Sequence, residues 1–202
     1  MHIWIQKNGL RVVIVFLALA VVLGIGYWFW WGATRLPVIS RAPDFTLQNV
    51  DGQPVKFSDL GGKVRLVEFF YANCPDICPT TTANMVKIQD QLKQKNLFGK
   101  DVVFVSITFD PERDSPAVLK NYAKNLKIDP SGWKLLRGTE EATKKVANDF
   151  GVFVEKEPDG SVTHTTQFFL VDRNNNVRGK YQMGDQMPTN KVLDNILQLV
   201  RE

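Results

Sequence analysis

Cys74 and Cys78 are the only two cysteines among the 202 residues of the chain, and three residues separate them. On a helical turn, side chains four positions apart share one face, with their β-carbons about 5–6 Å apart. That distance lets both sulfurs reach one metal ion, and it lies near the range from which a disulfide can close. The spacing therefore allows a metal site, a redox-active pair or a structural disulfide, and does not choose among them.

The elements on either side of the cysteines favour a chemically active pair. Residues 64–71 form a strongly apolar run that predicts a buried central strand, and residues 80–97 carry apolar residues at helical spacing. Open α/β sheets commonly bind ligands at such strand-to-helix junctions. The N–H groups and the dipole at a helix N-terminus also favour a thiolate. Because the thiolate is the form that binds metals and attacks disulfides, we expect the pair to do one or the other.

A histidine supplies a candidate third ligand. His2 precedes a long apolar segment, so His164 is the only histidine in the rest of the chain. It lies just before the apolar run of residues 167–171, a predicted strand that should begin at the same edge of the sheet as the cysteine loop. Two soft thiolates and one imidazole suit copper better than they suit hard cations, and a trigonal arrangement of these donors fits Cu(I). A structural zinc site would need a fourth protein ligand.

The first part of the chain predicts a membrane anchor. Val12 to Trp31 form an unbroken run of apolar and glycine residues, which as a helix would be roughly 30 Å long, about the thickness of a bilayer core. Basic residues precede the run and aromatic residues close it, as at a membrane interface. A cleaved signal peptide is the alternative, but the small-residue site Ala18-Leu19-Ala20 falls inside the run. We expect an uncleaved anchor, with the N-terminus inside.

The remainder of the chain predicts one α/β domain. Strands and helices alternate along it and are followed by a hairpin and a final helix, which indicates a sandwich with a mixed central sheet. Hydrophobic residues make up 44% of the chain and charged residues 23%, so a globular fold is expected rather than disorder. The net charge is +4 without a long run of like charges, and nothing specifically indicates nucleic-acid binding.

Three motifs resemble those of a known family. The segment Phe70–Pro79 resembles the metal-binding loop of the Sco/SenC family, and Asp110–Pro116 is similar to the second signature of that family. His164, shortly before a strand that ends in Asp172, is similar to its ligand histidine. The motifs occur in the family's order, and the resemblance extends from about Ala42 to the C-terminus. The cysteine spacing and the absence of a proline before the strand at 166–171 depart from true thioredoxins.

The resemblance implies a thioredoxin-like fold and one copper ion, Cu(I) or Cu(II), bound by Cys74, Cys78 and His164. Together with the apolar run, it gives four predicted parts of the chain: a cytoplasmic arm (1–11), a transmembrane anchor (12–31), a linker (32–41) and an extracytoplasmic copper-binding domain (42–202). The residues that it implies beside the site are Asp76, Asp110, Glu112, Arg113 and Asp114. The alternative for the segment 110–114 is a plain connector before a helix capped by Ser115.

The function implied by the resemblance is assembly of the dinuclear copper centre of cytochrome c oxidase. In that role the protein delivers copper to subunit II and depends on an upstream copper donor or thiol reductant. The alternative is a thiol–disulfide oxidoreductase that reduces the acceptor cysteines through Cys74 and Cys78 and does not need His164. Copper or redox sensing is a third hypothesis, and no feature of the sequence supports a signalling output.

Overall fold

The computed structural model describes residues 2–33, 35–156 and 162–202. The chain divides into two compact units, Met1–Pro37 and Val38–Glu202. Each unit has its own structure and is described by itself below.

The first unit is built around one helix, α1 (His2–Ala33). It begins well before the predicted start at Val12, because no proline or other strong stop signal interrupts the preceding residues. Large apolar side chains between Val12 and Tyr27 are exposed, among them Phe16 at 72%. The predicted aromatic end at 28–31 has side chains outside the described part of the chain. Among the described residues, no helix has the length and apolar character needed to cross a membrane, so the span 12–31 stays a prediction.

The second unit is built around a mixed sheet, as predicted. Its eight strands lie in the order β1-β10-β9-β4-β5-β6-β2-β3, and a separate pair is formed by β7 and β8. The strands are β1 (Ser40–Arg41), β2 (Thr46–Asn49), β3 (Pro54–Lys56), β4 (Val64–Phe70), β5 (Val102–Thr108), β6 (Trp133–Arg137), β7 (Val154–Lys156), β8 (Val162–His164), β9 (Gln167–Val171) and β10 (Asn176–Gln182). The central strands β4, β5 and β6 are parallel, and the other pairings are antiparallel.

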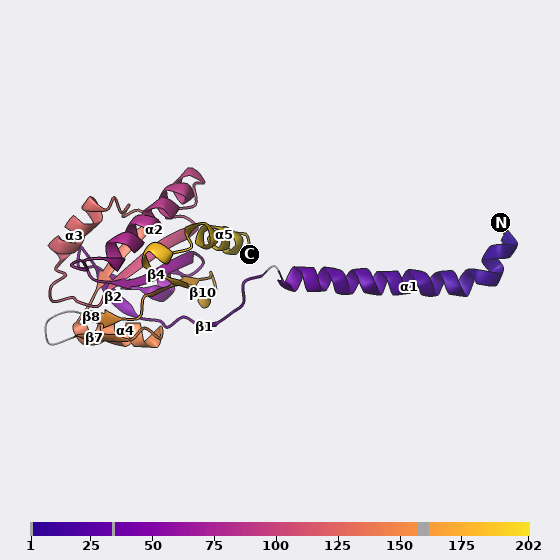
Figure 1. Cartoon of the computed structure of the whole chain (residues 1–202), viewed down its shortest axis with the longest axis horizontal. Helices are drawn as coiled ribbons and strands as arrows, with labels where there is room; N and C mark the ends of the chain where they lie inside the picture. The colour runs from indigo at the N-terminus through magenta and orange to yellow at the C-terminus, as the bar shows by residue number, and fades with distance from the viewer. Residues whose placement is uncertain (1, 34, 157–161) are drawn as a thin grey trace. The chain divides into compact units, whose positions relative to one another are not determined.

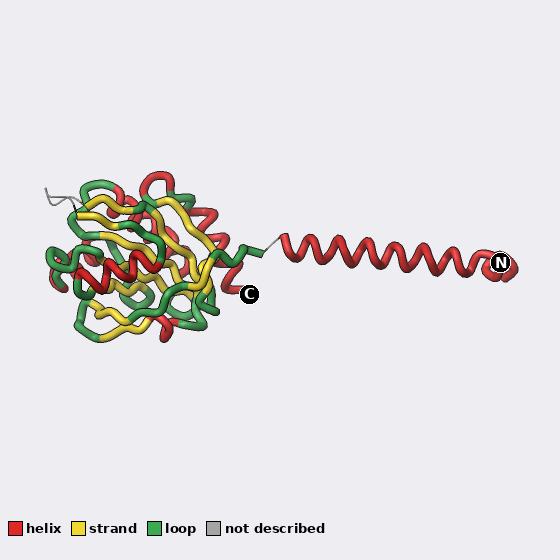
Figure 2. Tube along the Cα trace, turned by 90° about the horizontal axis from the view of Figure 1, so that it is seen from below, coloured by secondary structure: helices red, strands yellow, loops and turns green. Residues whose placement is uncertain are grey.

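Helices cover both faces of this sheet, as Figure 1 and Figure 2 show. The helices are α2 (Ile77–Gln94), α3 (Pro116–Asn125), α4 (Glu140–Asp149) and α5 (Thr189–Arg201), with short 3-10 turns η1 (Phe57–Leu60) and η2 (Gly184–Gln186). Alternate residues of β4 contact opposite layers: Phe69 packs on Phe150 at the end of α4, and Phe70 packs on Tyr122 of α3. Every residue of β4 is buried for this reason, which explains its nearly continuous apolar sequence.

The topology brings the predicted functional segments to one edge of the sheet. β4 and β5 are parallel, and Phe70 lies opposite Thr108, so the segments that follow these two strands begin side by side. β9 runs antiparallel to β4, and the start of β9 therefore lies at the same edge. The loop with Cys74, the segment 110–114 and His164 follow or precede these strand ends directly. The sequence-based expectation that they share one edge is confirmed.

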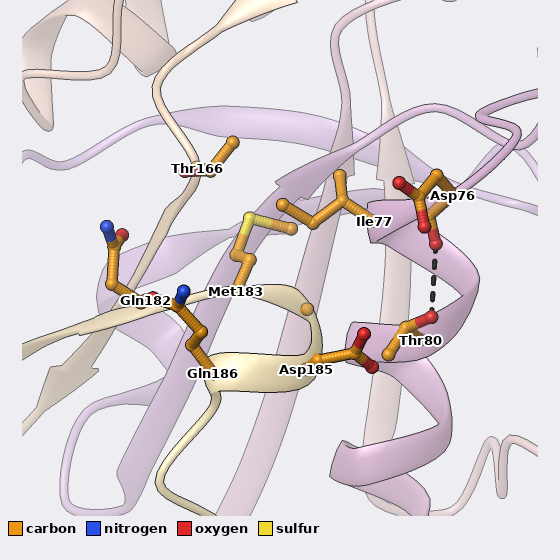
Figure 3. A pocket seen from close by; sticks show the side chains of 9 residues that line it. Asp76, Ile77, Thr80, Thr166, Gln182, Met183, Asp185 and Gln186 are labelled. Carbon is orange, nitrogen blue, oxygen red and sulfur yellow. Dashed lines mark hydrogen bonds between the residues drawn. The ribbon is translucent and has the colours of Figure 1, made fainter.

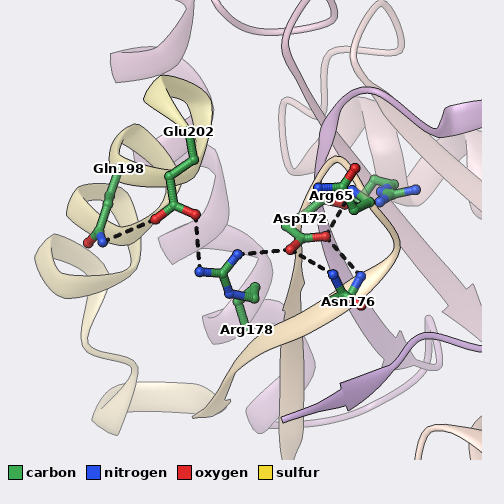
Figure 4. Close-up of polar contacts among 7 residues, drawn as sticks. Arg65, Asp172, Asn176, Arg178, Gln198 and Glu202 are labelled. Carbon is green, nitrogen blue, oxygen red and sulfur yellow. Dashed lines mark hydrogen bonds and ion pairs between the residues drawn. The ribbon is translucent and has the colours of Figure 1, made fainter. Parts of the chain in front are cut away.

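The opposite edge is held by a buried polar network (Figure 4). Arg65 at the start of β4 is fully buried, lies over the ring of Phe57 and donates to the backbone carbonyl of Asp172. Burial lowers the pKa of Arg65 to about 10, and the neighbouring Asp172 partly opposes this shift. Arg178 donates to Asp172 over 2.9 Å and to Glu202 over 3.1 Å. These contacts fasten the end of α5 to the turn between β9 and β10.

Candidate metal and thiol site

The two cysteines lie on either side of the start of α2. Cys74 is half-buried in the loop after β4, whereas Cys78 is fully buried in the first turn of the helix. α2 begins at Ile77, three residues before the predicted start, because a proline such as Pro79 is tolerated in the first turn of a helix. Both thiols are free, and the backbone N–H of Cys78 donates to Sγ of Cys74 over 3.4 Å.

The surroundings make the two thiols chemically unequal. A hydrogen bond from the Cys78 thiol is the main cause that lowers the pKa of Cys74 to about 5, and backbone N–H groups of Asp76 and Cys78 and the side chain of Tyr71 act in the same direction. The same thiol–thiol bond, together with burial, raises the pKa of Cys78. Cys74 therefore carries a thiolate at neutral pH while Cys78 keeps its proton.

His164 closes strand β8 and is half-buried. Its ring packs at a tilt on Phe109, with 4.8 Å between centroids, and edge-on against Tyr71 at 6.4 Å. Its Nδ1 atom lies 3.1 Å from the carbonyl oxygen of Thr165. Because a carbonyl oxygen only accepts hydrogen bonds, Nδ1 is the donor, and in the neutral imidazole the lone pair is then on Nε2. Nε2 is therefore the atom through which His164 can bind a metal.

Tyr71 is the neighbour shared by the cysteines and the histidine. Its hydroxyl bonds to Cys74 and its ring contacts His164. Burial, followed by the negative charge on Cys74, raises the pKa of Tyr71 to about 12, so it stays a neutral donor. Within the described residues, no three His, Cys, Asp or Glu side chains are grouped closely enough to hold a metal ion. Cys74 and Cys78 are in contact with each other, and Tyr71 is the residue that contacts both Cys74 and His164.

The donor chemistry suits a soft metal ion. A thiolate and a second thiol are already in contact, and His164, whose Nδ1 is held by a backbone carbonyl, contacts the ring of Tyr71 beside them. Soft thiolates with an imidazole favour copper among the biological metals. The residues therefore fit copper in kind, and the histidine has to approach the sulfurs for all three to bind one ion.

The segment 110–114 lies beside the cysteine loop and also precedes a capped helix. Asp110 and Arg113 form an ion pair within it, and Glu112 is exposed. Asp114 is buried and accepts a hydrogen bond from the backbone N–H of Ala72, in the cysteine loop. Ser115 caps α3 by accepting from the N–H of Val118 over 3.3 Å, as the alternative interpretation expects. The segment therefore lies beside the cysteine loop and also leads into a capped helix, and its role at a metal site stays a prediction.

Asp76 is exposed and lines a cavity of about 310 Å³ beside the start of α2 (Figure 3). Met183, which directly follows β10, and Asp185 of η2 line the same cavity. The walls are tied together, because Gly184 donates to Thr81 of α2 over 2.8 Å. Asp76 thus lines this cavity together with residues from the end of β10 and from η2.

Three residues with roles at the site were not identified from the sequence. Tyr71 was interpreted as the end of a strand and as one residue of the Phe70–Pro79 motif, without a role of its own, and Phe109 as the end of the next strand. Glu68 interrupts the apolar run of β4, which is the signal that could have identified it. It is 1% exposed, accepts from Ser106 over 2.6 Å, and its pKa is raised to about 7 by burial. Its second carboxylate oxygen has no hydrogen-bond partner among the described residues.

Comparison with known proteins identifies the family. A family model described as SCO1/SenC matches residues 37–201. The chain belongs to the SCO1/SenC family. The SCO1 protein homolog of Bacillus subtilis is 32% identical over 163 residues, which cover 79% of this chain and 83% of the relative. The family match agrees with the resemblance seen in the three sequence motifs.

Solved structures of family members share the fold. The crystal structure of a SCO1/SenC family lipoprotein from Bacillus anthracis superimposes with a TM-score of 0.75 at 36% identity and covers 82% of this chain and 98% of the other. Arabidopsis thaliana ScoI with copper bound gives a TM-score of 0.68 at 30% identity and covers 80% of this chain and 99% of the other. The α/β domain therefore has the thioredoxin-like Sco fold with a mixed sheet.

Proposed function

We propose that this SCO1/SenC family member binds one copper ion through Cys74, Cys78 and His164 and delivers it during assembly of cytochrome c oxidase. The observation that carries the proposal is the contact between a thiolate and a second thiol beside a histidine whose Nδ1 is held by a backbone carbonyl, which leaves Nε2 as the ligand atom. The copper-bound relative from Arabidopsis thaliana supports the choice of metal. The acceptor that we propose is the dinuclear copper centre of subunit II. An upstream copper donor would load this protein with its copper ion.

The chain's own residues define what binding requires. Cys74 supplies a thiolate without further change, whereas Cys78 has to lose its proton. His164 has to approach the sulfurs, and the hydrogen bond from its Nδ1 to Thr165 keeps Nε2 available as the ligand atom. Bound copper would supply a soft centre that acceptor thiolates can take over by ligand exchange.

We further propose that residues 12–31 anchor the protein in a membrane, with residues 1–11 in the cytoplasm and the domain outside it. The apolar run and the exposed apolar side chains between Val12 and Tyr27 support the anchor. The test is fractionation of the full chain beside a Leu17→Arg, Leu23→Arg variant. Retention of the wild type in carbonate-washed membranes and release of the variant are expected. Release of the wild type would overturn the anchor and leave the copper site unaffected.

A second candidate function is reduction of disulfides. The unequal thiols favour it: the Cys74 thiolate would attack an acceptor disulfide, forming a mixed disulfide and releasing one acceptor thiolate. Cys78, after losing its proton, would then attack Cys74, forming the Cys74–Cys78 disulfide and releasing the second acceptor thiolate. Two electrons pass to the acceptor, and a thiol reductant has to restore the pair. A solved relative described as having a disulfide switch is 30% identical, with a TM-score of 0.71.

One experiment separates the two functions. The reduced full chain in detergent micelles is titrated with Cu(I) and Cu(II) against a competing chelator, beside Cys74→Ala, Cys78→Ala and His164→Ala. Tight one-to-one Cu(II) binding that is lost in all three variants is expected. The opposite result is weak copper binding by the wild type and rapid reduction of a test disulfide by both the wild type and His164→Ala. That result would establish the oxidoreductase instead.

A further inference from the structure

Asp114 is a buried carboxylate that joins two loops 42 residues apart in the sequence. It is 1% exposed, and its oxygens lie 3.0 and 3.2 Å from the backbone nitrogen of Ala72. The hydroxyl of Thr108 donates to the same carboxylate over 2.5 Å. The carboxyl group thus accepts from the backbone of the cysteine loop and from the last residue of β5 at the same time. The carboxylate therefore fastens the cysteine loop to the end of β5.

The carboxylate is itself held in place from the sheet. Thr108 accepts from the backbone N–H of Asp110 over 3.0 Å, and the N–H of Asp114 donates to the carbonyl of Asp110 over 3.0 Å. Arg137 of β6 donates to the carbonyl of Pro111 over 2.9 Å. The segment 110–114 is thus braced by β5 and β6, so Asp114 presents its oxygens from a fixed support and not from a mobile loop.

Ala72 lies between the two residues that shape the site. Tyr71 precedes it and contacts both Cys74 and His164, while the N–H of Cys74 donates to the carbonyl of Tyr71 over 3.2 Å. A peptide group held at Ala72 therefore restrains the backbone that sets the positions of the Tyr71 ring and the Cys74 sulfur. Capping does not explain this contact, because Ser115 caps α3 and Asp114 does not.

We propose that Asp114 is a positioning residue that holds the Cys74 segment in the conformation that accepts copper, acting through the N–H of Ala72. The inference rests on the proposed copper site and adds to it the residue that orders its loop. Residues that orient metal ligands from outside the coordination sphere typically contribute about 10–100-fold to metal affinity. An Asp114→Asn amide keeps the size of the side chain but loses the charge and one acceptor oxygen.

The test compares Asp114→Asn with Asp172→Asn in the full chain. Asp172 is also a buried carboxylate that accepts from backbone N–H groups, at Asn174 and Asn176, but it lies at the opposite edge of the sheet. Two properties are measured: hydrogen exchange of the peptide covering residues 70–76 in the copper-free chain, and Cu(II) affinity. In Asp114→Asn, exchange should speed up at least tenfold and affinity should fall about 10–100-fold. In Asp172→Asn, the exchange rate and the Cu(II) affinity should both stay within about threefold of the wild type. The unfolding temperature of this variant should be lower than that of the wild type.

The outcomes keep the two proposals apart. Wild-type exchange and affinity in a folded Asp114→Asn variant would overturn the positioning role. A wild type that does not bind copper would overturn the proposed function, and the exchange data would still show whether Asp114 orders the loop. If Asp114→Asn does not fold, Thr108→Val decides, because it removes one donor to the same carboxylate and should show both effects to a smaller degree. Unchanged exchange and affinity in Thr108→Val would then overturn the inference.

Discussion

The backbone N–H of Cys78 points at Sγ of Cys74, with 3.4 Å between nitrogen and sulfur. The Cys78 thiol donates to the same sulfur, so negative charge is concentrated on the half-buried cysteine and not on the buried one. This arrangement arises because Cys78 lies in the first turn of α2 and Cys74 lies just before it. The half-buried thiolate is the group that an incoming metal ion or disulfide meets first.

The first prediction concerns the pH dependence of Cys74 reactivity. Its pKa is lowered to about 5 from the ordinary 9.0, so the thiolate forms as the pH rises through about 5. The rate of alkylation by iodoacetamide should therefore rise near pH 5 and level off well below pH 9. Cys78→Ala removes the main cause of the lowering and should move the rise to higher pH. Mass spectrometry of modified Cys74 across pH measures both; a rise of the wild-type rate only near pH 9 contradicts the assignment.

The second prediction isolates the hydroxyl of Tyr71. Tyr71→Phe keeps the ring that contacts His164 and Phe109 but removes the donor to Cys74. The alkylation profile should shift to higher pH, by less than in Cys78→Ala. Cu(II) affinity should fall by about tenfold, as is typical when a group around metal ligands is lost. Tyr181→Phe is the control, since its hydroxyl accepts from Asn195 elsewhere in the fold. Equal effects of the two substitutions would show that the Tyr71 hydroxyl has no special role.

The third prediction concerns Glu68 and stability. Burial raises its pKa from 4.5 to about 7, so the folded chain holds a proton that the unfolded chain releases above about pH 4.5. Stability contributed by this group should therefore fall as the pH rises from 4.5 to 7, by on the order of 3 kcal/mol at about 1.4 kcal/mol per pK unit. Glu68→Gln should lack this loss, because the amide does not ionise. Urea unfolding of both proteins at several pH values measures it, and parallel curves for the two proteins rule the assignment out.

The fourth prediction concerns the network at the opposite edge of the sheet. Arg178→Met removes the cation that pairs with the buried Asp172 and should cost about 3–5 kcal/mol of unfolding free energy, as is typical when one partner of a buried pair is lost. Lys145→Met breaks an exposed pair with Asp149 and should cost less than about 1 kcal/mol. Chemical denaturation measures both. Copper affinity should be unchanged in each, and a loss of affinity in Arg178→Met would mean that the two edges of the sheet are coupled.

Several elements and the candidate ligands follow from local sequence. The apolar runs at 64–71 and 167–171 predicted strands that match β4 and β9 closely. Ser115 was recognisable as a helix cap, and it accepts from the N–H of Val118, three residues later. The cysteine spacing and the strand-to-helix junction are equally local. Helix starts were less accurate at α1 and α2, and at α2 the N-cap residue makes no side-chain cap hydrogen bond that the sequence could signal.

The sequence by itself determined the chemistry available to this protein: two thiols four positions apart at a strand-to-helix junction, and one histidine before a later strand. Only the tertiary structure decided how those groups are tuned. The contact of Asp114 with Ala72, the packing of Tyr71 against His164 and the pairing of Ser40–Arg41 with β10 join segments far apart in the chain. Local propensity carries no information on such contacts, because they depend on which strands lie next to each other in the sheet and in which direction each strand runs.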